Sequence, residues 1–142
     1  MRLIYNVLIY LAAPVAFLMQ LWRGLRDPSY RERLGERFGF GSVLPVGTIW
    51  IHAVSVGEVQ AAEPLIKQLL ARHPRHPLLL TTVTPTGAAR ARQLFGETVQ
   101  LRYVPFDLPG SVRRFFDRVH PRLAMILETE LWPNLYAECG RR

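Results

Sequence analysis

Residues 48–71 read TIWIHAVSVGEVQAAEPLIKQLLA, and the spacing of the apolar residues changes partway along them. The first part, residues 48–53, is mostly apolar and rich in β-branched and aromatic side chains, which is typical of a strand. From 57 to 71 the apolar residues recur three and four positions apart, which predicts a helix with one buried face. A strand followed directly by a helix is the unit from which parallel α/β sheets are built.

The same alternation continues to the end of the chain. Further strands are expected at 77–83, 98–104 and 123–127, and further helices at 85–95, at 110–119 and from about residue 131. Strands alternating with helices of this length imply right-handed crossovers and a parallel sheet. We therefore predict an α/β fold with a Rossmann-like parallel sheet. Its first and fourth strands should be neighbours, and ligands should bind beyond the carboxyl ends of the strands.

An uncharged apolar segment precedes this pattern. Residues 3–22 read LIYNVLIYLAAPVAFLMQLW, and about 20 apolar residues are enough to span the hydrocarbon core of a bilayer. Pro14 would kink such a helix, which a membrane helix tolerates. A cleaved signal peptide and a buried soluble helix are the alternatives, and we favour an N-terminal transmembrane helix. Five arginines lie between positions 23 and 37 and only Arg2 precedes the segment, so the rest of the chain should be cytoplasmic.

A basic stretch follows the apolar segment. Asp27 and Pro28 have the pattern of a helix N-cap followed by proline, so a short helix is expected through Phe38. Its alternating arginines and glutamates form either a solvated face or a contact with lipid head groups, and both readings stay open. The predicted organisation is a membrane anchor, a juxtamembrane basic helix and loop, and a Rossmann-like acceptor-binding domain, over residues 1–25, 26–47 and 48–142.

Composition narrows the classes of function. The 142 residues carry a formal net charge of +7, and 17 of the 18 basic residues are Arg. The planar guanidinium group suits phosphate or carboxylate, although an Arg preference can also reflect genome composition. Such a chain is compatible with nucleic acid, anionic lipid or an acidic substrate. It contains no nucleic-acid recognition motif, no dinucleotide or P-loop fingerprint and no recognisable set of metal ligands.

Two glutamates follow strands that are expected to be neighbours. Glu58 lies in the first turn after the first strand, and Glu128 lies directly after the fourth. A carboxylate in a first turn can act as general base on a hydroxyl group, but the same position can also simply stabilise the helix. Glu128 and Glu130 are two residues apart at a strand end, so they need arginine partners or must face a polar cleft.

The loop before the second helix of the sheet is a further candidate. Thr84, Thr86 and Gly87 could hold a phosphate or a sugar hydroxyl at the helix N-terminus. Helix capping around Pro85 explains the same residues, and we slightly favour it.

Histidine and aromatic residues receive structural interpretations. We expect His52 to be a core histidine with satisfied hydrogen bonds, and His73 and His76 to be exposed in a polar turn. Trp132 and Tyr136 could cover a substrate, but the core is the safer expectation.

Five motifs occur together and in order along nearly the whole chain. They are YRERLGERFG, IHAVSVGEVQAAEPLI, TTVTPTGAARA, VPFDLPG and ILETELWPN, and they follow the apolar N-terminus. In combination they resemble the Kdo transferases, the 3-deoxy-D-manno-octulosonic acid transferases of lipopolysaccharide assembly. The resemblance implies a GT-B glycosyltransferase at the cytoplasmic face of the bacterial inner membrane. It would transfer Kdo from CMP-Kdo to lipid IVA, the precursor of lipid A, without a further cofactor.

The resemblance also implies roles for individual residues. Glu58 matches the family's proton acceptor, which deprotonates the attacking sugar hydroxyl. Glu128 matches the carboxylate that stabilises the transition state. Candidates for substrate binding are Ser55, Gly57, Thr84, Thr86, Gly87 and Glu130, and no metal site is expected.

The family continues into a second Rossmann-like domain that carries most of the CMP-Kdo site, and these 142 residues contain no candidate for it. We therefore expect an N-terminal acceptor-binding part that is inactive alone. A membrane-anchored module that binds lipid IVA without catalysis is the main alternative. A nucleic-acid partner, suggested by charge alone, is not expected.

Overall fold

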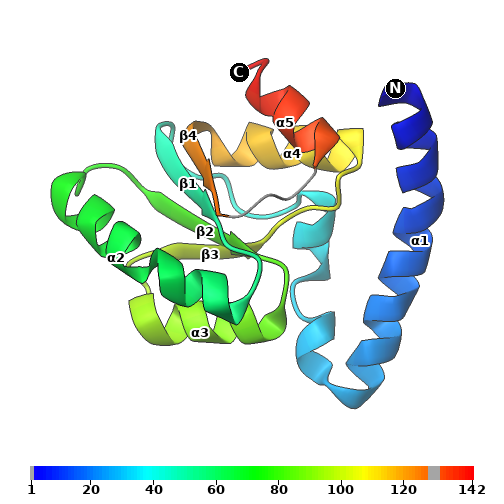
Figure 1. The fold of residues 1–142 in the computed structure, drawn as a ribbon, viewed down its shortest axis with the longest axis horizontal. Coiled ribbons are helices and arrows are strands. Elements are labelled where there is room, and N and C mark those ends of the chain that lie inside the picture. Colours follow the sequence, from blue (N-terminus) through cyan, green and yellow to red (C-terminus); the bar gives the residue numbers. More distant parts are fainter. Residues whose placement is uncertain (1, 128–131) are drawn as a thin grey trace. The chain divides into compact units, whose positions relative to one another are not determined.

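The structure is a computed structural model that describes residues 2–127 and 132–142 (Figure 1). Contacts divide the chain into two compact units. The first, called the sheet unit below, comprises Ser42–Val104 and Arg118–Glu130. The second, called the helical unit, comprises Met1–Gly41, Pro105–Asp117 and Leu131–Arg142.

The sheet unit is built on four parallel strands. They are β1 (Thr48–His52), β2 (Leu78–Thr82), β3 (Gln100–Tyr103) and β4 (Pro121–Ile126), in the spatial order β3-β2-β1-β4. Every neighbouring pair is parallel. The predicted α/β class is confirmed, and so is the prediction that the first and fourth strands are neighbours. The ends of all four strands lie within a few residues of their predicted positions.

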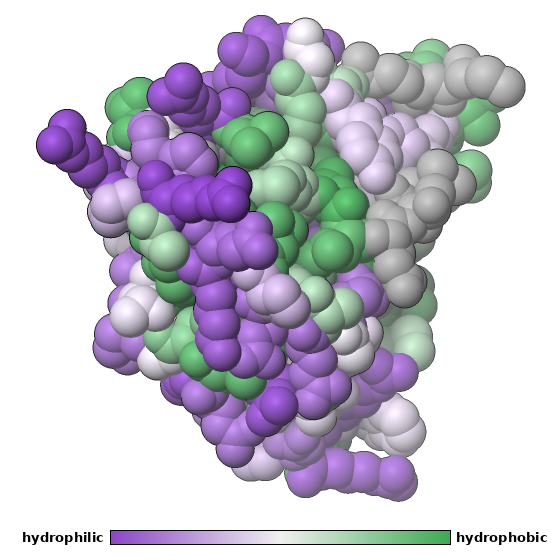
Figure 2. Space-filling view, turned by 60° about the vertical axis from the view of Figure 1, so that its left-hand side comes forward, coloured by the Kyte–Doolittle hydropathy of each residue, from purple (hydrophilic) through white to green (hydrophobic). Residues whose placement is uncertain are grey.

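Two helices cover one face of this sheet (Figure 1). They are α2 (Val56–Arg72) and α3 (Pro85–Phe95), and each directly follows a strand. Their apolar faces form one core with β1 and β2, whose members are Ile49, Ile51, Ala53, Val59, Ala62, Ile66, Leu78, Leu80, Ala91, Phe95 and Val99. Figure 2, which brings the α2 side of Figure 1 forward, shows a mainly hydrophilic surface. The amphipathic spacing in the sequence therefore corresponds to an inner apolar face and an outer polar one.

The helical unit contains α1 (Arg2–Arg26), most of α4 (Pro109–Val119) and α5 (Pro133–Cys139). Among the described residues, α1 is long and apolar enough to cross a membrane, by length and composition. The ring of Phe38 makes edge-on contacts with Phe17 of α1 and with Phe106, at centroid distances of 5.4 and 5.5 Å. Aromatic packing thus links α1 to the loop before α4.

The predicted continuous helix after Asp27 is wrong in one respect. Asp27 does cap a helical segment, since its side chain accepts a hydrogen bond from Ser29 N–H. The segment is split, however, into two 3-10 turns, η1 (Pro28–Arg31) and η2 (Leu34–Phe38). Arg33 separates them with a left-handed φ of 56°, a conformation that no continuing right-handed helix can include. The Arg33 guanidinium group donates two hydrogen bonds to the carboxylate of Glu36, within the first turn of η2.

Candidate functional site

The loops that leave β1 and β2 are joined at the carboxyl edge of the sheet. The carbonyl oxygen of Val54 accepts hydrogen bonds from the Val83 N–H at 3.2 Å and from the Thr82 hydroxyl at 2.9 Å. Because α2 and α3 begin directly after these loops, their N-termini lie next to each other. Helix N-termini carry unpaired N–H groups and a partial positive charge, so this edge is suited to anionic or oxygen-rich ligands.

Glu58 is held in a defined orientation at the start of α2. The Ser55 hydroxyl donates to Glu58 Oε1 at 3.0 Å, and the Val54 N–H donates to Glu58 Oε2 at 2.7 Å. Ser55 is the N-cap of α2, and its Oγ accepts from the Glu58 N–H at 3.5 Å. This is a capping box in which the glutamate reaches the residue before the cap. A carboxylate has about four acceptor positions, so two remain available to a hydroxyl group.

Thr84 caps α3 in the same manner. Its hydroxyl accepts a hydrogen bond from the Gly87 N–H at 3.1 Å, and the exposed Thr86 hydroxyl lies 3.3 Å from it. The preferred interpretation of these residues as capping groups is therefore confirmed. A ligand role for them is untested and remains a prediction.

The two glycines among the candidates have different environments. A Cβ on Gly87 would lie 2.5 Å from Thr82 Oγ1 and 3.5 Å from the Ser55 carbonyl carbon, so the junction of the two loops needs glycine there. Gly57 is exposed, and a Cβ on it would meet only Ser55 Oγ, at 3.9 Å. Packing explains Gly87. It does not explain Gly57.

The fourth strand leads toward the same edge. Leu127 N–H donates to the carbonyl oxygen of His52 at 3.0 Å, directly after β4 and beside the end of β1. Glu128 and Glu130, which follow in the chain, lie outside the described residues, so their predicted roles stay predictions.

His52, at the end of β1, has a polar atom that the sequence analysis missed. The residue is fully buried, as expected for a core histidine, and Nδ1 lies 2.8 Å from Thr81 Oγ1. Among the described residues Nε2 has no hydrogen-bond partner, so the core position is confirmed and the expected pairing of the whole ring stays a prediction. Burial lowers the pKa of His52 from 6.5 to about 4. The backbone of Thr81 and the negative charge of Glu58 act in the opposite direction.

Asp107, in the helical unit, was not singled out by sequence analysis. It is 1% exposed, and its carboxylate accepts from the N–H groups of Asn134 at 2.9 Å and Leu135 at 2.8 Å. It therefore caps the N-terminus of α5 from a distant part of the chain. Asn134 and Leu135 are buried, whereas Tyr136 is 39% exposed, so the core expectation for Tyr136 is wrong; Trp132 is half-buried.

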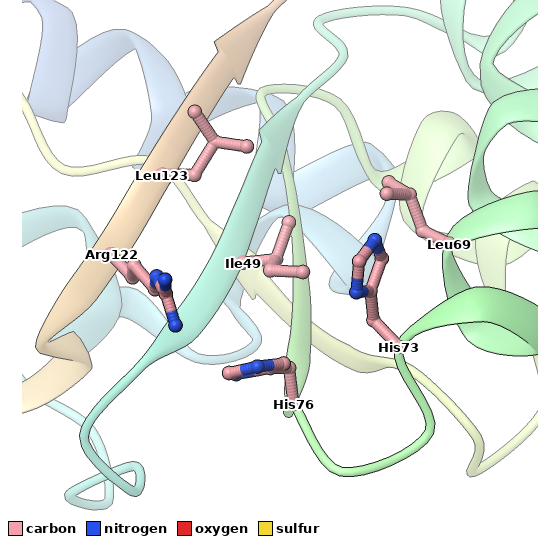
Figure 3. Close-up of a pocket in the computed structure, with 6 residues that line it drawn as sticks. All are labelled: Ile49, Leu69, His73, His76, Arg122 and Leu123. Atoms are coloured by element: carbon pink, nitrogen blue, oxygen red, sulfur yellow. The ribbon is translucent and has the colours of Figure 1, made fainter.

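A separate pocket of about 210 Å³ lies at the opposite, amino edge of the sheet (Figure 3). Ile49, Leu69 and Leu123 supply apolar walls, and three basic side chains surround Ile49. These are His73 and His76, from the turn after α2, and Arg122 of β4. His73 is exposed as expected, but His76 is half-buried and its Nδ1 lies 3.1 Å from Gly47 O. Among the described residues no group of three or more His, Cys, Asp or Glu could hold a metal ion.

Comparison with known proteins gives a consistent family. Residues 32–142 match the sequence model described as 3-Deoxy-D-manno-octulosonic-acid transferase (kdotransferase). The chain is 44% identical over 137 residues to the 3-deoxy-D-manno-octulosonic acid transferase of Haemophilus influenzae, covering 94% of this chain and 32% of that relative. It is 39% identical over 147 residues to the Bordetella pertussis protein of the same name, covering 96% and 34%. A probable mitochondrial transferase of Arabidopsis thaliana is 35% identical over 134 residues, covering 93% and 30%. The chain thus spans about a third of the length of the curated relatives that it matches.

Proposed function

The chain belongs to the 3-deoxy-D-manno-octulosonic acid (Kdo) transferase family, and we propose that it forms the acceptor-binding part of an enzyme that transfers Kdo from CMP-Kdo to lipid IVA. The observation that carries the proposal is the position of Glu58. Its carboxylate is oriented by the capping box where two helix N-termini meet at the carboxyl edge of the sheet. That edge is where ligands bind in sheets of this kind.

In the proposed reaction Glu58 accepts the proton of the attacking hydroxyl group of lipid IVA. The hydroxyl oxygen then forms a bond to the anomeric carbon of Kdo, while the bond from that carbon to the phosphate oxygen breaks and CMP leaves with the electron pair. Glu128 stabilises the charge that develops in the transition state. Ser55 orients Glu58, and the N-termini of α2 and α3, with Gly57, Thr84, Thr86 and Gly87, face the acceptor. Glu130 is a secondary contact.

We further propose that α1 attaches the protein to the cytoplasmic face of the bacterial inner membrane. The proposed organisation remains an anchor over 1–25, a basic segment over 26–47 and an acceptor-binding domain over 48–142. Arg23 and Arg26 follow the apolar segment and favour an anionic lipid surface. A membrane location suits an enzyme whose acceptor is a phosphorylated lipid, because guanidinium groups pair bidentately with phosphate.

A chimera tests the enzymatic proposal. Residues 1–142 replace the matching third of the Haemophilus influenzae relative, and transfer of labelled Kdo to lipid IVA is measured. We expect Glu58→Gln to lower kcat by about 10²–10⁴-fold, the usual contribution of a general base. Glu63→Gln is the matched control on the same helix. It removes only a surface ion pair with Lys67, and activity should be unchanged. A Glu58→Gln chimera with full activity would exclude Glu58 as the base.

A binding module without catalysis is the second candidate. Both oxygens of Glu58 already accept hydrogen bonds in the capping box. Stabilisation of α2 by itself would therefore explain a glutamate at this position, which favours the binding module. The 142 residues by themselves should not transfer Kdo, since the relatives are about three times as long. Lipid IVA binding by the chain that survives Glu58→Gln, together with an inactive chimera, would favour the binding module. An active chimera that loses turnover with Glu58→Gln would favour the enzyme.

A further inference from the structure

Helix α1 has two different faces. Its outer face is exposed and apolar along the whole helix, and includes Leu3, Ile4, Val7, Leu8, Leu11, Val15, Leu18, Met19, Trp22 and Leu25. Its inner face is buried or half-buried and contains Tyr5, Asn6, Ile9, Ala13, Phe17, Gln20 and Gly24. The most polar residues of the apolar segment thus point toward the protein, the reverse of a soluble amphipathic helix.

The inner face is fixed near the N-terminal end of α1. The Tyr5 hydroxyl donates to Asp107 Oδ2 at 2.7 Å, and the Asn134 side-chain amide donates to Asn6 Oδ1 at 2.9 Å. Asp107 and Asn134 are 1% and 3% exposed. Tyr5 of α1 therefore donates to the buried carboxylate that caps α5, and Asn6 of α1 accepts from the buried Asn134 of α5.

The inner face is also in contact farther along the helix. Phe17 packs edge-on against Phe38, and Gly24 is buried against the side chain of Arg31, where a Cβ would overlap its aliphatic part. Positions 5 and 24 of a helix are about 28 Å apart, close to the thickness of a hydrocarbon core of about 30 Å. Other residues of the helical unit thus contact α1 near both of its ends and near its middle.

These contacts are incompatible with α1 crossing a bilayer. A crossing helix would either carry Asp107 and Asn134 through the hydrocarbon region or lose its contacts with them. Either outcome leaves buried polar groups without partners in a medium that offers none. We propose that α1 lies parallel to the membrane surface, with its outer face in the lipid and its inner face on the protein. The inference rests on the proposed membrane attachment.

The chemistry of the outer face agrees with a lipid occupant. The face is apolar from Leu3 to Trp22, and Arg23 and Arg26 follow it. The Arg26 guanidinium lies 5.2 Å from the Trp22 ring centroid, which suits a tryptophan and a cation at the level of anionic head groups.

A depth measurement tests the orientation. Ile4, Leu11, Leu18 and Leu25 lie seven residues apart on the outer face and are 67%, 69%, 63% and 70% exposed. Each is changed to Cys in the full chain, in a Cys139→Ser background, and carries a nitroxide label. The chain is bound to vesicles of phosphatidylethanolamine and phosphatidylglycerol. We expect all four labels at one depth, about 5–10 Å below the head groups. A label at Gln68, exposed on α2, is the water-exposed control.

Several results would overturn the proposal. A gradient with the greatest depth at Leu11 and Leu18, and with Ile4 and Leu25 near opposite surfaces, shows a crossing helix. Dimerisation that shields the four labels from lipid shows that a second copy covers the face. If the chain does not bind to the vesicles, the proposed membrane attachment itself fails. A transferase chimera that remains active in that case leaves the enzymatic proposal standing.

A variant pair tests whether the inner contacts hold the helix in place. Tyr5→Phe with Asn6→Leu removes the hydrogen bonds to Asp107 and Asn134 and leaves Gln20 as the strongly polar residue of the segment 3–22. The depth profile should then change toward that of a crossing helix. Tyr10→Phe, on the 55% exposed outer tyrosine, should leave the four depths equal. An unchanged profile in the double variant would show that these contacts do not set the orientation.

Discussion

The Ser55 hydroxyl and the Glu58 carboxylate hold each other in place at the first turn of α2. Ser55 Oγ donates to Glu58 Oε1 at 3.0 Å and accepts from the Glu58 N–H at 3.5 Å. The arrangement stabilises the helix and aims the proposed catalytic base with the same two residues. Stability and activity must therefore be measured together for any substitution here.

The first prediction separates orientation from chemistry. Ser55→Ala should lower the free energy of unfolding by about 1 kcal/mol, because it removes the N-cap of α2. In the chimera it should also lower kcat while KM for lipid IVA stays nearly constant, since Glu58 remains but is less well oriented. Urea denaturation in detergent and steady-state kinetics provide the two readouts. Thr86→Ala removes an exposed hydroxyl and should change stability by less than about 0.5 kcal/mol. Unchanged kcat in Ser55→Ala would show that Glu58 needs no orientation by this hydroxyl.

The second prediction compares two glycines. Gly87→Ala should be destabilising by about 1–3 kcal/mol, because its Cβ would overlap Thr82 Oγ1. Gly57→Ala meets no close atom within a helix and should stabilise the chain by about 0.5–1 kcal/mol. If the acceptor approaches the N-terminus of α2, Gly57→Ala should nevertheless reduce transfer by the chimera. A more stable and fully active Gly57→Ala protein would remove Gly57 from the binding site.

The third prediction concerns pH. Burial lowers the pKa of His52 to about 4, so the folded protein binds this proton less well than the unfolded chain does. The resulting stability is complete above pH 6.5 and is lost as the pH falls toward 4, by about 3 kcal/mol in total. Between pH 7 and pH 5 the wild-type chain should lose about 2 kcal/mol more than His52→Asn does. His73→Asn, which removes an exposed imidazole, is the matched control for the substitution itself.

Direct titration gives an independent check of the same group. In nuclear magnetic resonance spectra the chemical shifts of the carbon-bound imidazole protons of His52 should remain those of the neutral ring down to about pH 4. A midpoint near 6.5 would contradict the burial of an unprotonated ring.

The fourth prediction concerns the cap of α5. Asp107→Asn keeps the shape of the side chain but replaces one of its two acceptor oxygens with an NH2 group, so the N–H of either Asn134 or Leu135 loses its acceptor. The free energy of unfolding should fall by about 2–3 kcal/mol. Asp117→Asn is the control, since Asp117 is half exposed and pairs with Arg142, and it should cost less than about 1 kcal/mol. Equal effects of the two substitutions in thermal denaturation would argue against a structural role for Asp107.

Local rules account for most of the sheet unit. Alternation of apolar strands and amphipathic helices predicted β1 to β4, α2 and α3, and the common strand order predicted that β1 and β4 are neighbours. The position of Glu58 in a first turn was also readable, because caps act within a few residues. The family motifs added the proposed roles of Glu58 and Glu128.

Long-range contacts were not readable in this way. His52 is an unremarkable strand residue in the sequence, and only the packing of β1 between β2 and β4 leaves its Nε2 without a partner among the described residues. The helix expected after Asp27 was interrupted by Arg33, whose left-handed backbone no propensity rule indicated. Asp107 caps a helix that begins 26 positions later in the chain, at Pro133.

The amino-acid sequence alone determined the α/β class, the apolar N-terminal segment and the family, because periodicity, length and motifs are local properties of the chain. Only the tertiary structure showed that the polar residues of α1 face the rest of the helical unit. Tyr5 and Asn6 interrupt an apolar run in the sequence, but in the folded chain they meet Asp107 and Asn134, more than 100 positions away. Buried polar groups must find partners wherever the fold supplies them, and those partners can be distant in sequence.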